Sequence, residues 1–247
     1  MSTVILTLTL TLRQLLGKRR ALLMLGLAAL PVLMAVIFRI GEPDVSHHRW
    51  VANVLLKGFI VTAILPLCTL VFGTTALGAE IEDGTAVYLL FKPLPRSHVV
   101  GAKLGAAWFL AVLLVSLSTG VSATIALLGT GGASILVGFT VATVLGCFVY
   151  CCVFVLLSAV TSRALIGGLI YVFLWEGVVT ELFTGTRMLS VRQYTLGVAD
   201  LIANTSHHTF EANLGGVTAL SLMVMVSVAA VALAIRRLSR FEVRGGA

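Results

Sequence analysis

The stretch of sequence that decides the fold runs from residue 104 to residue 162 and reads LGAAWFLAVLLVSLSTGVSATIALLGTGGASILVGFTVATVLGCFVYCCVFVLLSAVTS. It contains no Asp, Glu, Lys or Arg. A helix needs roughly 20 apolar residues to cross the hydrocarbon core of a bilayer, so an uncharged stretch of this length predicts two spanning helices. The glycine-rich segment Gly129-Thr-Gly-Gly-Ala-Ser134 is the expected turn between them.

Further apolar runs lie on both sides of this stretch. Hydrophobic residues make up 59% of the chain and charged residues 11%, which excludes a soluble domain because too few polar groups remain to cover its surface. We therefore predict an all-α, polytopic membrane protein in which residues 1–247 form a single transmembrane domain. The six expected spans cover residues of about 21–38, 58–79, 104–128, 135–160, 164–183 and 212–235.

The segment before the first span alternates Thr and Leu with a period of two residues, a pattern that in water indicates a strand. An unpaired strand at a membrane leaves its backbone groups unsatisfied. We therefore favour an interfacial helix over residues 3–17, with Ile5, Leu8, Leu12 and Leu15 on one side.

The distribution of Lys and Arg predicts the orientation, because cytoplasmic loops retain these residues. A multi-pass protein of the cell membrane with both termini in the cytoplasm places 12 of the 17 basic residues inside and leaves five outside. This bias and the attraction to anionic headgroups explain the net charge of +7 without nucleic acid as a partner. The inner group is Arg13, Lys18, Arg19, Arg20, Lys92, Arg96, Lys103, Arg163, Arg236, Arg237, Arg240 and Arg244, and the outer group is Arg39, Arg49, Lys57, Arg187 and Arg192.

A charged segment between the second and third spans, residues 80–96, is expected on the cytoplasmic side. Asp83 can cap a short helix, Lys92 lies at its far end as the helix dipole favours, and Pro93 and Pro95 stop it. The helix presents five consecutive large apolar residues, 87–91, to a loop that should face water. They either fold back on the membrane or the other helices, or they bind a soluble partner.

This segment resembles the loop between the second and third helices of the ABC-2 family of ATP-binding-cassette transporter membrane subunits. The resemblance rests on Gly78-Ala-Glu-Ile-Glu-Asp-Gly-Thr85, Leu89-Leu90, Pro93, Arg96 and Gly101-Ala-Lys103. The six spans, the inside termini and the N-terminal helix also match that family. Ile81 departs from the pattern, since members often carry a basic residue there.

The resemblance implies a mechanism in which the short helix is a coupling helix that inserts into a separate nucleotide-binding subunit. Closure of two such subunits on ATP would move two coupling helices and switch the pathway between two membrane subunits. The chain would thus form half of the pathway of an exporter, as a dimer with itself or with a related membrane subunit. The expected partner-binding residues are Glu82, Asp83, Gly84, Thr85, Val87, Tyr88, Leu89, Leu90, Phe91 and Arg96.

The chain has no phosphate loop of the Gly-x-x-x-x-Gly-Lys-Ser/Thr type. We therefore expect ATP and Mg²⁺ to be bound by the partner ATPase subunit, and no cofactor or metal to be bound by this chain. Its four cysteines fall inside spans and fit small apolar fillers, and the doublets His47-His48 and His207-His208 fit solvated loops better than metal ligands. The chain is not expected to be an enzyme.

Two acidic residues interrupt the fifth span. A carboxylate at this depth usually faces protein or water, so Glu176, with Glu181 nearer the outer surface, could line the translocation pathway or bind a cationic substrate. The alternative is that the span ends at Trp175 and both acids cap a surface re-entrant segment, since members of the resembled family often have a re-entrant pair of short helices there.

Two other classes of protein compete with the transporter subunit. A secondary transporter or channel that works without ATP would use Pro31 and Pro66 to break spans and Glu176 as a proton relay. It leaves the apolar cytoplasmic segment unexplained. A membrane scaffold without transport is the second alternative.

Overall fold

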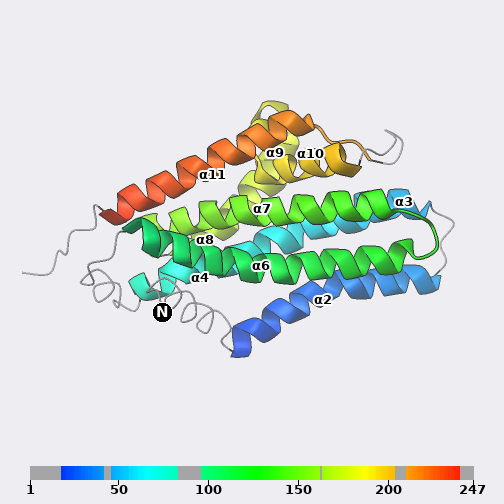
Figure 1. Ribbon diagram of the computed structural model, residues 1–247, viewed down its shortest axis with the longest axis horizontal. Coiled ribbons are helices and arrows are strands. Elements are labelled where there is room, and N and C mark those ends of the chain that lie inside the picture. Colours follow the sequence, from blue (N-terminus) through cyan, green and yellow to red (C-terminus); the bar gives the residue numbers. More distant parts are fainter. Residues whose placement is uncertain (1–17, 42–45, 83–95, 162, 204–209, 240–247) are drawn as a thin grey trace, which may run out of the picture.

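The computed structural model describes residues 18–41, 46–82, 96–161, 163–203 and 210–239. These residues form helices and no strand, and the long helices lie side by side in one bundle (Figure 1). The expected all-α class is confirmed. The expected interfacial helix over residues 3–17 lies outside the described residues.

The helices of the described chain follow the expected spans in order. They are α2 (Lys18–Gly41), α3 (His47–Trp50), η1 (Val51–Ile64), α4 (Leu65–Glu82), α6 (Arg96–Leu127), α7 (Ala133–Val160), α8 (Ala164–Ile170), η2 (Tyr171–Val179), α9 (Thr180–Leu182), η3 (Thr184–Leu189), α10 (Val191–Ala203) and α11 (Gly216–Ser239). Here η1 and η2 are π-helical and η3 is a 3₁₀-helix. In Figure 1, α11 ends at the left of the bundle, whereas α2 begins nearer its middle, at the lower edge.

Five helices in the described part of the chain are long and apolar enough to cross a membrane. They are Leu22–Gly41, His47–Gly78, Ser97–Leu127, Ala133–Val160 and Gly216–Leu238. The helix at the place of the expected fifth span, Ala164–Val179, is apolar but shorter. The protein is therefore a multi-pass membrane protein whose fifth apolar segment differs from the rest.

The second spanning helix begins earlier than the expected start at residue 58. In the sequence, Lys57 interrupts the run of uncharged residues from which the span is predicted. In the structure, the helix includes Lys57 and begins at His47. The Lys57 ammonium lies 5.6 Å from the centre of the Phe210 ring, a cation–π contact that offsets part of its loss of water. The π-helical stretch η1 ends directly before Leu65-Pro66, where the wider turn accommodates a proline that donates no backbone hydrogen bond.

The central helix of the bundle is α7. It packs against α4, α6, α10 and α11, and Phe139, Tyr150 and Phe154 on it are fully buried. On the outside, α2 packs against α6 and keeps Pro31 in its interior. Ser118 of α6 donates a 2.6 Å hydrogen bond to the carbonyl of Ala28, in the turn that Pro31 disturbs. Pro31 removes the helical donor to the carbonyl of Leu27, and the bond from Ser118 to the adjacent carbonyl of Ala28 connects α2 to α6 in this turn.

The fifth apolar segment is broken. From α8 through η2 and α9 it runs from the left end of the bundle to about its middle, and α10 continues toward the right end, between α7 and α11 (Figure 1). The sequence treats residues 184–211 as a loop, but the structure places η3 and α10 there and buries nearly all of α10. This break positions the polar site described next.

Candidate functional site

A polar cluster lies inside the bundle at the break in the fifth segment. We define the Glu176 cluster as the side chain of Glu176 on η2 together with its donors on Tyr150, Tyr171, Val191 and Arg192. Only 2% of the Glu176 surface is exposed, and Tyr150 is fully buried. The cluster joins three elements, since Tyr150 belongs to α7, Tyr171 to η2, and Val191 and Arg192 to α10.

The Glu176 carboxylate accepts hydrogen bonds from all four donors. The Tyr150 hydroxyl donates to Oε2. The Tyr171 hydroxyl donates to Oε1 at 3.2 Å, and the backbone N–H groups of Val191 and Arg192 donate to the same oxygen at 3.0 and 3.3 Å. In addition, the Arg192 guanidinium donates from Nη1 to the backbone carbonyl of Glu176 at 3.4 Å. A buried carboxylate with this many donors is satisfied without water.

Two of these donors identify the role of the carboxylate. Val191 and Arg192 are the first two residues of α10, whose N–H groups have no partner within the helix. Ser190, the residue before them, accepts a 3.4 Å hydrogen bond from the N–H of Gln193 on its hydroxyl oxygen. Glu176 and Ser190 together therefore cap α10, and the negative charge lies at the positive end of the helix dipole.

The cluster lies deep in the apolar layer. Along α7, Tyr150 is roughly 26 Å from Ala133 and roughly 15 Å from Val160 at ~1.5 Å per residue. Charged groups at such depth are costly unless they meet opposite charge or strong donors. Arg192 is 8% exposed and brings a positive charge beside Glu176, although the sequence counts it among outer-loop residues.

The structure bears on the interpretation in which the fifth span ends at Trp175 and both acids cap a surface segment. The helix does not end at Trp175, because it continues through Leu182. Glu176 caps α10, but this helix continues toward the other end of the bundle and is buried rather than at the surface. Glu181 is part of α9, and the orientation of its side chain lies outside what the structure describes.

The predicted coupling residues lie mostly outside the described part of the chain. Residues 83–95 are not described, so Asp83 through Phe91 have no assigned place. Glu82 is the last residue of α4 and Arg96 the first of α6. These two helix ends lie at the left of Figure 1, where α11 also ends.

Lys103 and the four cysteines lie in surroundings that are typical of structural residues. Lys103, expected at the inner membrane surface, is 1% exposed on α6 and donates a 2.7 Å hydrogen bond to the carbonyl of Ala76 on α4. All four cysteines are buried thiols. Within residues 18–41, 46–82, 96–161, 163–203 and 210–239, no three His, Cys, Asp or Glu side chains come together as metal ligands.

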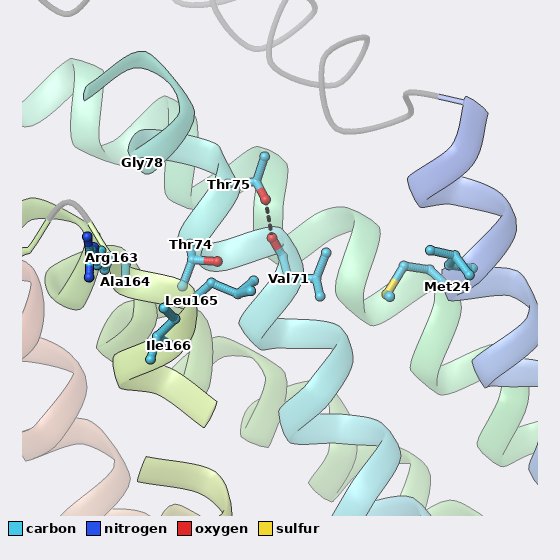
Figure 2. Close-up of a pocket in the computed structure, with 10 residues that line it drawn as sticks. Met24, Val71, Thr74, Thr75, Gly78, Arg163, Ala164, Leu165 and Ile166 are labelled. Carbon is cyan, nitrogen blue, oxygen red and sulfur yellow. Dashed lines mark hydrogen bonds between the residues drawn. The ribbon is translucent and has the colours of Figure 1, made fainter. Parts of the chain in front are cut away.

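A cavity of about 470 Å³ lies between α2, α4 and α8. Figure 2 shows Met24 of α2 on one side of α4 and Arg163 to Ile166 of α8 on the other, with Val71, Thr74 and Thr75 between them. The lining is completed by Leu23 and Gly78. The cavity is a second candidate site, separate from the Glu176 cluster because the two share no residue.

Comparison with protein families gives a match to the model of ABC-2 family transporter proteins over residues 17–183. The chain belongs to this family. The match begins at the start of α2 and ends directly after α9, so α10 and α11 lie beyond it. Comparison with curated proteins gives no match. The protein is a membrane subunit of an ATP-binding-cassette transporter, a subunit that is not itself catalytic.

Proposed function

We propose that this subunit forms half of the pathway of an exporter and is driven by a separate ATPase subunit that binds residues 82–91. The single observation that carries the proposal is the position of Glu82 and Arg96, the two helix residues that flank the charged segment. They end α4 and begin α6, two helices that pack against each other, and these helix ends lie at the left end of the bundle, where α11 also ends. The family match covers both helices.

Charge supports the cytoplasmic location of that end. The first turn of α2 contains Lys18, Arg19 and Arg20, α8 follows Arg163, and the last turn of α11 contains Arg236 and Arg237. Basic residues next to spanning helices are retained in the cytoplasm, where ATP is available. The five apolar residues from Val87 to Phe91 would then be buried by a soluble partner.

The test is a pull-down of a nucleotide-binding subunit from membranes that contain this protein. The double substitution Tyr88→Asp with Leu89→Asp places two charges in the apolar segment, and we expect loss of most of the bound ATPase subunit because buried unpaired charges are costly. The matched control, Thr130→Asp with Ser134→Asp, adds the same charges at the α6–α7 turn and should retain the partner. Full retention by the first variant would refute the docking assignment.

Within this function we assign Glu176 a positioning role. Its carboxylate is occupied by four donors and holds α10 against η2 and α7. A role in binding a cationic cargo would require the cluster to open during transport. The described arrangement supports the capping role.

A further inference from the structure

The cavity between α2, α4 and α8 combines two kinds of surface. Five of its lining side chains are large and apolar: Leu23, Met24, Val71, Leu165 and Ile166. Arg163 adds a guanidinium at the start of α8. A volume of about 470 Å³ falls within the range of ligand sites, and an apolar wall with one strong cation selects an amphipathic anion.

The other polar groups of the lining are already engaged. The Thr74 and Thr75 hydroxyls donate to the carbonyls of Leu70 and Val71 at 2.7 and 2.6 Å, within α4. None of the ten lining residues that the structure describes is acidic. Arg163 is therefore the principal group in this cavity that could recognise a ligand by charge.

The surroundings indicate where the ligand comes from. Leu22 and Leu23 on α2 are 72% and 67% exposed, and Leu165 and Ile166 on α8 are 45% and 54% exposed, so the cavity opens onto surfaces that face lipid. Arg163 lies between the end of the spanning helix α7 and the start of α8, and basic residues at the ends of spanning helices are typically found near the headgroups. A planar guanidinium binds phosphate with two parallel hydrogen bonds, and basic pockets between spanning helices at the cytoplasmic side bind anionic headgroups.

We propose that this cavity binds an anionic phospholipid, with one acyl chain against Val71, Leu165 and Met24 and the phosphate on Arg163. The site is independent of the ATPase partner. It would hold α2 and α8 together through a lipid, since these helices form opposite sides of the cavity (Figure 2).

The experiment measures lipids retained by the purified full-length protein, by native mass spectrometry after addition of phosphatidylglycerol or phosphatidylcholine. We expect roughly fivefold stronger retention of phosphatidylglycerol, the contribution of one basic residue at an anionic surface. Arg163→Gln should abolish this preference, and Arg163→Lys should keep part of it because the charge remains without the planar fork. The matched control Arg237→Gln removes an exposed charge of α11, which lines no part of this cavity, and should leave the preference unchanged.

Two further arms test the acyl chain. Leu165→Trp adds volume to the cavity and should lower retention of both lipids, with folding checked by circular dichroism. Glycerol phosphate, which has the headgroup chemistry but no chain, should fail to displace the lipid. Equal retention of the two lipids by the natural protein, an unchanged preference in Arg163→Gln, or full displacement by glycerol phosphate would each overturn the proposal.

Discussion

The carboxylate of Glu176 accepts hydrogen bonds from donors on α7, η2 and α10, so one side chain connects three elements of the fold. Hydrogen bonds to an ionised group contribute about 1.5 to 3 kcal/mol each, more than neutral ones, and the loss of a partner leaves the remaining groups buried and unsatisfied. The contribution of each donor should therefore depend on its burial and its distance from the carboxylate.

The two tyrosines of the cluster provide a matched pair. Tyr150→Phe removes a fully buried hydroxyl and should lower the free energy of unfolding by about 2 kcal/mol. Tyr171→Phe removes a half-buried donor at 3.2 Å and should cost about 1 kcal/mol or less. Unfolding in mixed detergent micelles, followed by tryptophan fluorescence, gives both values. Equal costs for the two variants would contradict the expectation that the more buried donor contributes more.

The residues of the cluster differ in how far the sequence identifies them. Glu176 is identified because a carboxylate in an apolar run needs an explanation. Tyr150 and Tyr171 give no such signal, since tyrosines in spans also serve as ordinary core residues. Arg192 is misplaced, because counting charges assigns every basic residue to a water-facing side, whereas this one is buried inside the bundle and donates to the Glu176 carbonyl.

At the scale of elements, close contacts with α10 depend on glycine. A Cβ added to Gly138 of α7 would lie 2.8 Å from both the Cβ and the backbone nitrogen of Ala203, and 3.0 Å from the carbonyl oxygen of Ala199. These atoms belong to the backbone or lie next to it, so α10 itself would have to move. Glycine at this position lets the two helices approach closely, as small residues do in membrane interfaces.

Replacement of this glycine should therefore weaken the docking of α10. Gly138→Ala is expected to lower the free energy of unfolding by about 1 to 3 kcal/mol, the usual cost of overpacking. The control Gly105→Ala lies inside α6 with no atom within 4 Å of the added Cβ and should be neutral or stabilising by up to about 1 kcal/mol. Thermal unfolding in detergent measures both, and indistinguishable midpoints would refute the close packing.

Some helices of this fold can be predicted from composition, and others cannot. Long helices are predictable because the bilayer sets their length and excludes charge. By contrast, α10 has 13 residues and contains Arg192, Gln193 and Asp200, so it is too short and too polar to count as a span. Its burial results from contacts with α7 and α11, which a count along one segment does not include.

For the whole molecule, the positions of the helix ends predict which residues are accessible from each side. The four natural thiols are at most 1% exposed and should not react with maleimides in the folded protein, whereas denaturation should make all four reactive. Because the natural thiols should not react, the labelling of a single introduced cysteine measures on which side of the membrane that residue lies.

An impermeant maleimide applied to intact cells provides the measurement. Ser134→Cys, at the exposed start of α7, should be labelled from outside. Arg237→Cys, at the exposed end of α11, should be labelled only after the membrane is opened. The reverse pattern would invert the proposed orientation and remove the ATPase-binding segment from the cytoplasm.

The buried cap of α10 has a consequence for the connection that precedes it. Each residue turns a helix by about 100°, so one residue inserted or deleted between Phe183 and Ser190 would rotate α10 about its axis or displace its first turn from Glu176. Ordinary loops between spans tolerate changes in length. This connection has a fixed register instead, and sequence drift within it should be limited to substitutions that preserve its length.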